Sequence, residues 1–169
     1  MSKFSLVING VLFQLVWFLS IFVKLEMAVV ALFFMMLHVI SKLINKQGVF
    51  ISALALFMGV TMDAVLHYAG VYEFPIQNEL DYFYLPSWLL IIWMGFSLAL
   101  PYSLYWMFKN RFLFIGLMSA LAPVSYLAGR EFAMIEFTNG QLIYVVLAWS
   151  IWSFLLMLFF TLFNKRYCE

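Results

Sequence analysis

The chain has 169 residues, of which 67% are hydrophobic and only 10% are charged, and its mean hydropathy is +1.04. A water-soluble domain usually carries about 25% charged residues, so these charges are too few to cover a soluble surface and the apolar side chains must face lipid. The net charge of +1 excludes the basic stripe with which nucleic-acid-binding proteins release counterions. The composition therefore predicts an integral membrane protein whose partner is the lipid bilayer and not nucleic acid.

Six segments are long and apolar enough to cross the hydrocarbon, which takes about 20 mainly apolar residues. The first is followed directly by Lys24, Leu25 and Glu26 and not by a small-residue cleavage site, so we expect it to be retained as a helix. A tight turn must join it to the second. The sequence thus predicts an all-α polytopic fold with six transmembrane helices in a single domain, residues 1–169. The predicted helices cover residues 4–23, 25–41, 48–69, 87–108, 112–129 and 142–163.

The basic residues predict the orientation, because Lys and Arg are enriched in cytoplasmic loops. The termini and connecting segments fall alternately on the two sides of the membrane. One side holds seven basic residues and the other holds two, and six acidic residues lie on the side with two. Both termini are therefore predicted to be cytoplasmic. The basic residues on the cytoplasmic side are Lys3, Lys42, Lys46, Lys109, Arg111, Lys165 and Arg166, and those on the other side are Lys24 and Arg130.

The longest connecting segment, residues 70–86, falls on the outer side and is acidic and aromatic. Two interpretations stay open: it is a connector at the membrane interface, or it is a lid that folds over the helices. Aromatic residues near helix ends are typical of interfacial belts. Those near the predicted ends are Tyr68, Tyr72, Tyr82, Tyr84, Trp88, Trp106 and Tyr167.

Asp63 is the most informative single residue. It lies 15 residues into the third predicted helix, about 22 Å along its axis, in the outer half of the hydrocarbon. An ionised carboxylate there costs roughly 2.5–3.5 kcal/mol on insertion scales, so it should face the interior of the bundle, be paired or be protonated. His67 lies one turn further out on the same face, and Ala55 and Gly59 continue the stripe inward. The pair is either a proton-linked or ligand-binding site, or a hydrogen-bond clamp between helices.

The end of the fifth predicted helix offers partners for Asp63. Pro123 frees a backbone carbonyl and favours a kink, and Ser125 and Tyr126 provide hydroxyl groups. Arg130, at the outer boundary, could reach back to the carboxylate and offset the cost of its burial; in the alternative it is a solvated residue at the helix end. The predicted polar cluster consists of Asp63, His67, Ser125, Tyr126 and Arg130.

Other features indicate packing. Gly95, Ala99 and Ser103 form a small-residue ridge on the fourth predicted helix, which is typical of close helix contacts. Pro101 is expected to kink the inner half of that helix. Isolated polar side chains that are expected to join helices by hydrogen bonds are Asn9, Gln14 and His38.

No catalytic motif is recognised. The chain has no His-Glu-x-x-His zinc helix, no Gly-x-Ser-x-Gly elbow, no glycine-rich phosphate loop and no second intramembrane aspartate for a protease dyad. Asp63 and His67 are too few ligands for a metal ion. No metal and no cofactor is expected, and enzyme activity stays open.

The centre of the chain resembles a known family. It combines Asp63 within a predicted helix, Gly70 before an aromatic and acidic patch, and the sequence LPSWL at residues 85–89. Further positions that carry the resemblance are Trp93, Phe96, Ser103, Leu104, Trp106, Pro123, Tyr126 and Gly129. This pattern resembles the bacterial family catalogued as domain of unknown function 2878, which comprises small inner-membrane proteins. The resemblance implies a location in the bacterial inner membrane and brings no established activity.

Three functions are compatible with these observations. The favoured one is the binding or transport of a small apolar or lipid-like molecule through the polar cluster in the outer half. The second is an accessory subunit that docks on a membrane partner subunit through its intramembrane charge and small-residue ridges. The third is a membrane enzyme that acts on lipid, with Asp63 and His67 as acid and base.

Overall fold

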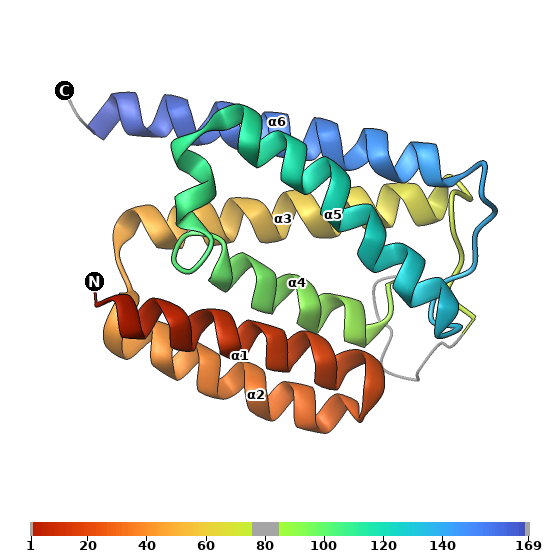
Figure 1. Ribbon diagram of the computed structural model, residues 1–169, viewed down its shortest axis with the longest axis horizontal. Coiled ribbons are helices and arrows are strands. Elements are labelled where there is room, and N and C mark those ends of the chain that lie inside the picture. Colours follow the sequence, from red (N-terminus) through yellow and green to blue (C-terminus); the bar gives the residue numbers. More distant parts are fainter. Residues whose placement is uncertain (1, 76–84, 168–169) are drawn as a thin grey trace. The chain divides into compact units, whose positions relative to one another are not determined.

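The computed structural model describes residues 2–75 and 85–167, and in these residues it is helical except for turns and one isolated β-bridge (Figure 1). The predicted all-helical fold is confirmed in this part of the chain. The loop prediction for residues 70–86 falls largely on residues 76–84, which lie outside the described residues. The helices are α1 (Lys3–Phe22), α2 (Leu25–His38), the π-helix η1 (Val39–Leu43), α3 (Lys46–Tyr68), α4 (Ser87–Ala99), the 3-10 helix η2 (Tyr105–Lys109), α5 (Arg111–Glu131) and α6 (Leu142–Tyr167).

Five of the helical segments described are long and apolar enough to cross a membrane, and α4 is a shorter apolar helix. Large apolar side chains lie exposed along them, among them Phe33, Phe57 and Phe112. In water such side chains would be buried, so their exposure indicates lipid around the helices. This pattern is that of a multi-pass membrane protein. The five segments are Lys3–Phe22, Leu25–Leu43, Lys46–Tyr68, Arg111–Glu131 and Leu142–Phe163.

The predicted fourth helix, residues 87–108, is wrong beyond Ala99, where α4 ends. Proline has no backbone N–H, and its ring clashes with the carbonyl four residues earlier. Pro101 therefore terminates the helix instead of kinking it, and turns lead to η2. One consequence is that Tyr102 lies in a turn and is buried.

The contacts divide the chain into two compact units. Unit 1 consists of Met1–Val60 and Ile76–Trp106, and unit 2 consists of Thr61–Pro75 and Met107–Glu169. The boundary passes through α3, so this helix contributes its first part to unit 1 and its last turns to unit 2. Each unit is described by itself.

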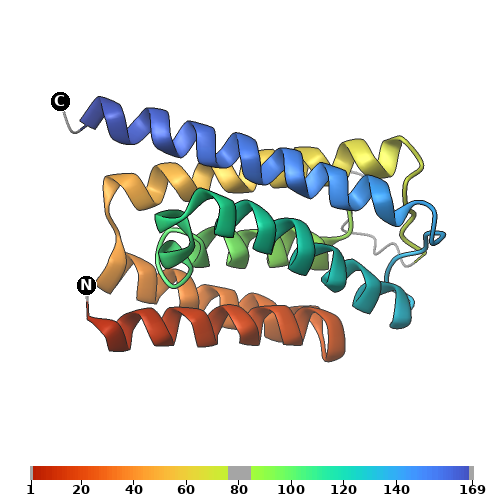
Figure 2. The ribbon, with the colours of Figure 1, turned by 45° about the horizontal axis from the view of Figure 1, so that its top comes forward.

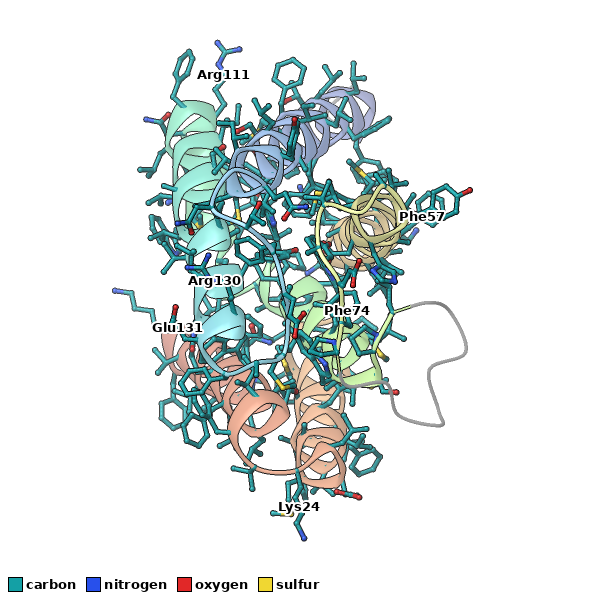
Figure 3. The ribbon with its side chains drawn as sticks, turned by 90° about the vertical axis from the view of Figure 1, so that its right-hand side faces the viewer. Lys24, Phe57, Phe74, Arg111, Arg130 and Glu131 are labelled. Carbon is teal, nitrogen blue, oxygen red and sulfur yellow. The ribbon has the colours of Figure 1, made fainter. Side chains whose placement is uncertain are left out.

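In unit 1, α1 and α2 form the predicted tight hairpin and lie side by side (Figures 1 and 2), with Lys24 at its turn (Figure 3). Polar side chains join the helices. The amide of Asn9 on α1 donates to the carbonyl of Leu98 at 3.3 Å. His38 on α2 donates through Nε2 to the carbonyl of Ser5 at 3.0 Å. The prediction that Asn9 and His38 join helices by hydrogen bonds is confirmed.

In unit 2, α5 and α6 pack against each other and diverge toward the end of α5 (Figure 2). Aromatic rings fill one end of this contact: the ring of Phe108 lies 4.6 Å from the ring of Phe114 and 4.6 Å from that of Phe160, between centroids. Further along, the hydroxyl of Ser150 on α6 donates to that of Ser119 on α5 at 2.9 Å. An apolar contact with an internal hydroxyl bond is a packing mode well suited to helices in lipid.

Candidate functional site

The site begins with the way two helices of unit 2 end. Gly70 after α3 and Ala133 after α5 have positive φ angles of 70° and 55°. In both turns the amide of the next residue donates at 2.9 Å to the carbonyl four residues before the turn residue, which is the six-to-one bond of the Schellman motif. Glycine adopts this conformation without steric cost. The two motifs lead the chain out of each helix into an extended segment.

The two extended segments pair with each other. Three residues beyond each turn, Glu73 and Glu136 exchange both backbone hydrogen bonds, at 2.9 Å each, in an antiparallel bridge. Side chains alternate along the segments, so Tyr72, Phe74 and Ile135 are buried while both glutamates are exposed. The bridge therefore forms a small cap with an apolar inner face and an acidic outer face.

Asp63 lies under this cap with a side chain that is 0% exposed. Its Oδ1 accepts a hydrogen bond from the hydroxyl of Tyr72 at 2.7 Å and another from the hydroxyl of Tyr126 at 2.6 Å. These distances lie at the short end for hydroxyl bonds, where bonds to a carboxylate fall. One oxygen atom thus joins three elements of unit 2: the last turns of α3, the cap and α5.

Aromatic rings surround this oxygen. The ring of Tyr72 lies 5.7 Å from that of Tyr126 and 5.4 Å from that of Phe74, between centroids. On α6, Trp149 lies 6.3 Å from Tyr126 and 5.1 Å from Trp152. A shell of this kind lowers the local dielectric constant and strengthens the hydrogen bonds inside it.

The structure brings together two of the five predicted site residues, Asp63 and Tyr126. His67 lies beside the cluster, where its Nδ1 donates to the backbone carbonyl of Tyr72 at 3.0 Å, so it supports the cap and does not bond to the carboxylate. The hydroxyl of Ser125 donates to the carbonyl three residues earlier in α5, and α5 continues through Pro123 without interruption.

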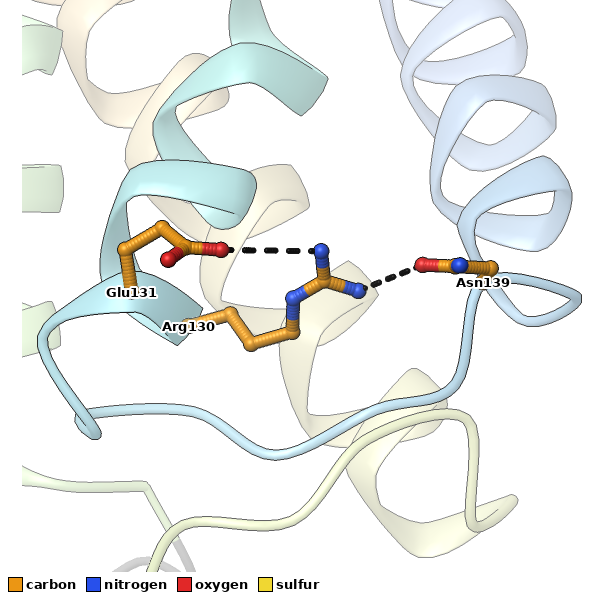
Figure 4. A network of polar contacts seen from close by, with 3 residues as sticks. All are labelled: Arg130, Glu131 and Asn139. Atoms are coloured by element: carbon orange, nitrogen blue, oxygen red, sulfur yellow. Dashed lines mark hydrogen bonds and ion pairs between the residues drawn. The ribbon is translucent and has the colours of Figure 1, made fainter.

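Arg130 points elsewhere (Figure 4). Its guanidinium donates to the side-chain oxygen of Asn139 at 2.8 Å, lies 3.7 Å from the carboxylate of Glu131 and stacks over the ring of Phe137 at 5.0 Å. The expected pairing with Asp63 is not made. The guanidinium side chain is 30% exposed and keeps part of its hydration, which avoids the desolvation cost of a buried ion pair. Of the two interpretations, a solvated residue at the helix end describes Arg130 better.

Tyr72 is absent from the predicted cluster, where it counted only as an interfacial aromatic residue. Two signals point to it. Gly70 favours the left-handed turn that ends a helix, and the residues from Tyr72 to Phe74 alternate between aromatic and acidic, as in a short extended segment with one buried face. Together they direct the side chain of Tyr72 back to the helix that precedes it.

Burial raises the pKa of the Tyr72 phenol well above its ordinary value of 10.0, and the neighbouring Asp63 and Tyr126 raise it further. In the unfolded chain the same phenol loses its proton near pH 10. Above that pH the unfolded state binds fewer protons than the folded state, so stability falls as pH rises. The contribution of Tyr72 to the free energy of unfolding is therefore fully present below about pH 10 and is lost at higher pH.

We expect Tyr72→Phe to flatten the alkaline part of the stability profile. The variant is less stable than the wild type at pH 8 because one hydrogen bond is missing, but it loses less stability between about pH 10 and pH 12, since no phenol is held protonated at this position. Thermal unfolding in detergent across this range measures the effect. Tyr144→Phe, at an exposed tyrosine of α6, is the control and keeps the wild-type slope. Equal slopes for Tyr72→Phe and the wild type would contradict the prediction.

Comparison with known proteins adds one result. A family model described as "Protein of unknown function (DUF2878)" matches residues 6–158. The comparisons with curated proteins and with solved structures gave no match. The matched span includes Asp63, Tyr72 and Tyr126.

Proposed function

The chain belongs to the DUF2878 family of proteins of unknown function, and from this premise we propose that it is a six-span protein of the bacterial inner membrane that binds a small apolar or lipid-like molecule. Both termini lie in the cytoplasm in this proposal, which the seven-to-two distribution of basic residues supports. α4 counts as the fourth crossing, because the alternation of charge requires a crossing there.

The observation that carries the binding proposal is a partly open cavity of about 280 Å³ in unit 1. It lies between the end of α2 with η1, the first part of α3 and the end of α4. Ligand sites are typically concave and mainly apolar, and this lining fits that description. The lining residues are Met36, Val39, Ile40, Ile44, Val49, Ser52, Ala53, Leu56, Met94, Ser97, Leu98 and Tyr102.

The polar groups in the lining bond to each other. Because Pro101 has no N–H, the carbonyl of Ser97 lacks its usual helical donor, and the hydroxyl of Ser52 donates to it at 2.8 Å. The hydroxyl of Ser97 donates in turn to the carbonyl of Met94 at 2.8 Å. The wall therefore offers mainly apolar surface, which favours an apolar molecule over a hydrophilic one.

In this proposal the polar cluster under the cap is a clamp. Asp63 is fully buried, and hydroxyls from two other elements meet at one of its oxygens. Of the two interpretations of this residue, the geometry supports the hydrogen-bond clamp. The ligand is proposed to lie in the cavity of unit 1 and not at Asp63.

Filling the cavity tests the proposal. Native mass spectrometry of gently purified wild type should detect a retained apolar or lipid-like molecule. Ala53→Phe on α3 and Met94→Trp on α4, which add bulk at two lining positions, should each reduce its occupancy at least fivefold. Val11→Phe, at an exposed position of α1 outside the lining, is the control and retains the molecule. Equal occupancy in all four folded proteins would refute the cavity as the binding site.

A second candidate is the accessory subunit, and one surface of α5 favours it. At Gly116 no heavy atom lies within 4 Å of the position that a Cβ would take, and Ala120, one turn later, is exposed. Small residues on a lipid-facing surface permit close approach of another helix. If this surface docks a partner, Gly116→Leu releases a subunit that copurifies with the wild type, whereas cavity-filling variants retain it.

A further inference from the structure

The connection from η1 to α3 forms part of the lining of the cavity in unit 1. Ile40 and Ile44 line the cavity. Lys42 lies between them in η1, and Lys46 is the first residue of α3. Both lysines are exposed, and neither forms an ion pair with another residue in the described part of the chain. Two exposed cationic side chains thus lie within three residues of residues that line the apolar cavity.

Local hydrogen bonds hold this connection in place. The amide of Ile44 donates to the carbonyl of Val39 at 2.8 Å, which is the i to i+5 bond of a π-helix, a form often found at functional sites. Asn45 caps α3 by accepting from the amide of Gly48 at 2.8 Å, and its own amide donates to the carbonyl of Leu43 at 3.0 Å. The backbone that carries the lysines is therefore already ordered.

The charges around the cavity have one sign. Between Val39 and Val49 the chain holds two lysines and no acidic residue, and the lining segment from Met94 to Tyr102 holds no charged residue. An anionic group beside this connection meets cations and no carboxylate of these segments. The ammonium group of a zwitterionic lipid would find no acidic partner there.

An apolar chain alone gains little by leaving lipid for such a cavity, because lipid tails are equally apolar. Preference for a particular lipid must come from its headgroup. Basic clusters on the cytoplasmic side of membrane helices favour anionic headgroups by about fivefold for each lysine near the surface. The predicted orientation places Lys42 and Lys46 on that side.

We propose that the cavity of unit 1 holds an acyl chain of an anionic phospholipid from the cytoplasmic leaflet, and that Lys42 and Lys46 bind its phosphate. The inference rests on the proposed function, since it requires the cavity to be the binding site. It adds the class of ligand and the residues that select it.

Native mass spectrometry with phosphatidylglycerol and phosphatidylcholine of identical acyl chains tests the proposal. We expect the wild type to bind phosphatidylglycerol at least tenfold better than phosphatidylcholine. In the double variant Lys42→Gln with Lys46→Gln, the affinity for phosphatidylglycerol falls to that for phosphatidylcholine, which is itself unchanged. Lys24→Gln removes one positive charge at the α1–α2 turn, away from the cavity, and keeps the preference. Ala53→Phe weakens the binding of both lipids.

The outcomes separate this inference from the function on which it rests. If the wild type shows no preference, or if the double variant keeps it, the lysine site is refuted while the cavity stands. If Ala53→Phe and Met94→Trp bind both lipids as the wild type does, the cavity is refuted and this inference falls with it. A preference that Lys24→Gln also abolishes would reflect net charge alone and would overturn the assignment to Lys42 and Lys46.

Discussion

Asp63→Ala is expected to lower the free energy of unfolding by about 2–6 kcal/mol, because two buried hydroxyl donors lose their acceptor. The substitution leaves the hydroxyls of Tyr72 and Tyr126 without the oxygen that both now contact, inside a shell from which water is largely excluded. An unsatisfied buried donor costs about 1–3 kcal/mol. It also leaves a space the size of a carboxylate under the cap.

Two comparisons make this measurement specific. Asp63→Asn keeps an oxygen that both hydroxyls can reach, so it should cost only about 1–2 kcal/mol. Tyr72→Phe and Tyr126→Phe each remove one donor and should cost about 1.5–3 kcal/mol, the range for hydrogen bonds to charged groups. Chemical unfolding in detergent, followed by tryptophan fluorescence, measures all four. If Asp63→Ala unfolds within about 0.5 kcal/mol of the wild type, the clamp interpretation is wrong.

Gly59→Ala is the second substitution with a large expected effect. In unit 1 a Cβ at this position of α3 would overlap the indole ring of Trp93, which is buried at 3% exposure. A buried indole is rigid and has no flexible end that could move aside. Adding even one methyl group to a packed core costs about 1–3 kcal/mol, and we expect the upper end of that range.

Gly116→Ala is the matched control for Gly59→Ala. Both glycines lie inside helices, but the position at Gly116 opens onto free space. Alanine is favoured over glycine in a helix by about 1 kcal/mol, so this variant should be as stable as the wild type or more so. Thermal unfolding of the two variants side by side gives the answer. Equal changes in both would mean that helix propensity and not overlap with Trp93 determines the result.

Much of the helical architecture could be predicted because apolar length is a strong signal in membrane proteins. The predicted starts and ends of the first and third helices differ from α1 and α3 by no more than two residues. The prediction of the fourth helix failed at Pro101, where the apolar composition continues although the backbone cannot continue as a helix. An apolar run reports how a segment partitions into lipid, and it does not report whether each backbone carbonyl has a donor. The hydroxyl of Ser52, which satisfies the carbonyl of Ser97, comes from another helix.

The polar cluster was predictable only in part. The cost of a carboxylate in hydrocarbon pointed to Asp63, and the end of the fifth predicted helix offered the hydroxyls of Ser125 and Tyr126, of which Tyr126 donates to the carboxylate while Ser125 bonds within its own helix. The contribution of Tyr72 depends on a reversal of the chain at Gly70 that periodicity along a helix does not contain. Of the two interpretations left open for Arg130, the pairing with Asp63 considered the cost of burying the carboxylate but not that of burying the guanidinium, which reaches Asn139 and stays partly hydrated.

The separation of the two tyrosines from Asp63 has a consequence for biosynthesis. Tyr72 follows the aspartate by only 9 residues, whereas Tyr126 follows it by 63. At synthesis rates of 5–20 residues per second, the ribosome makes the second tyrosine roughly 3–13 s after the aspartate. During that interval α3 has to enter the bilayer, and the turn at Gly70 supplies a hydroxyl from the same nascent segment. Tyr72 is thus available as the first partner of the carboxylate while the remaining helices are still being translated, and α5 and the Glu136 half of the cap are added later.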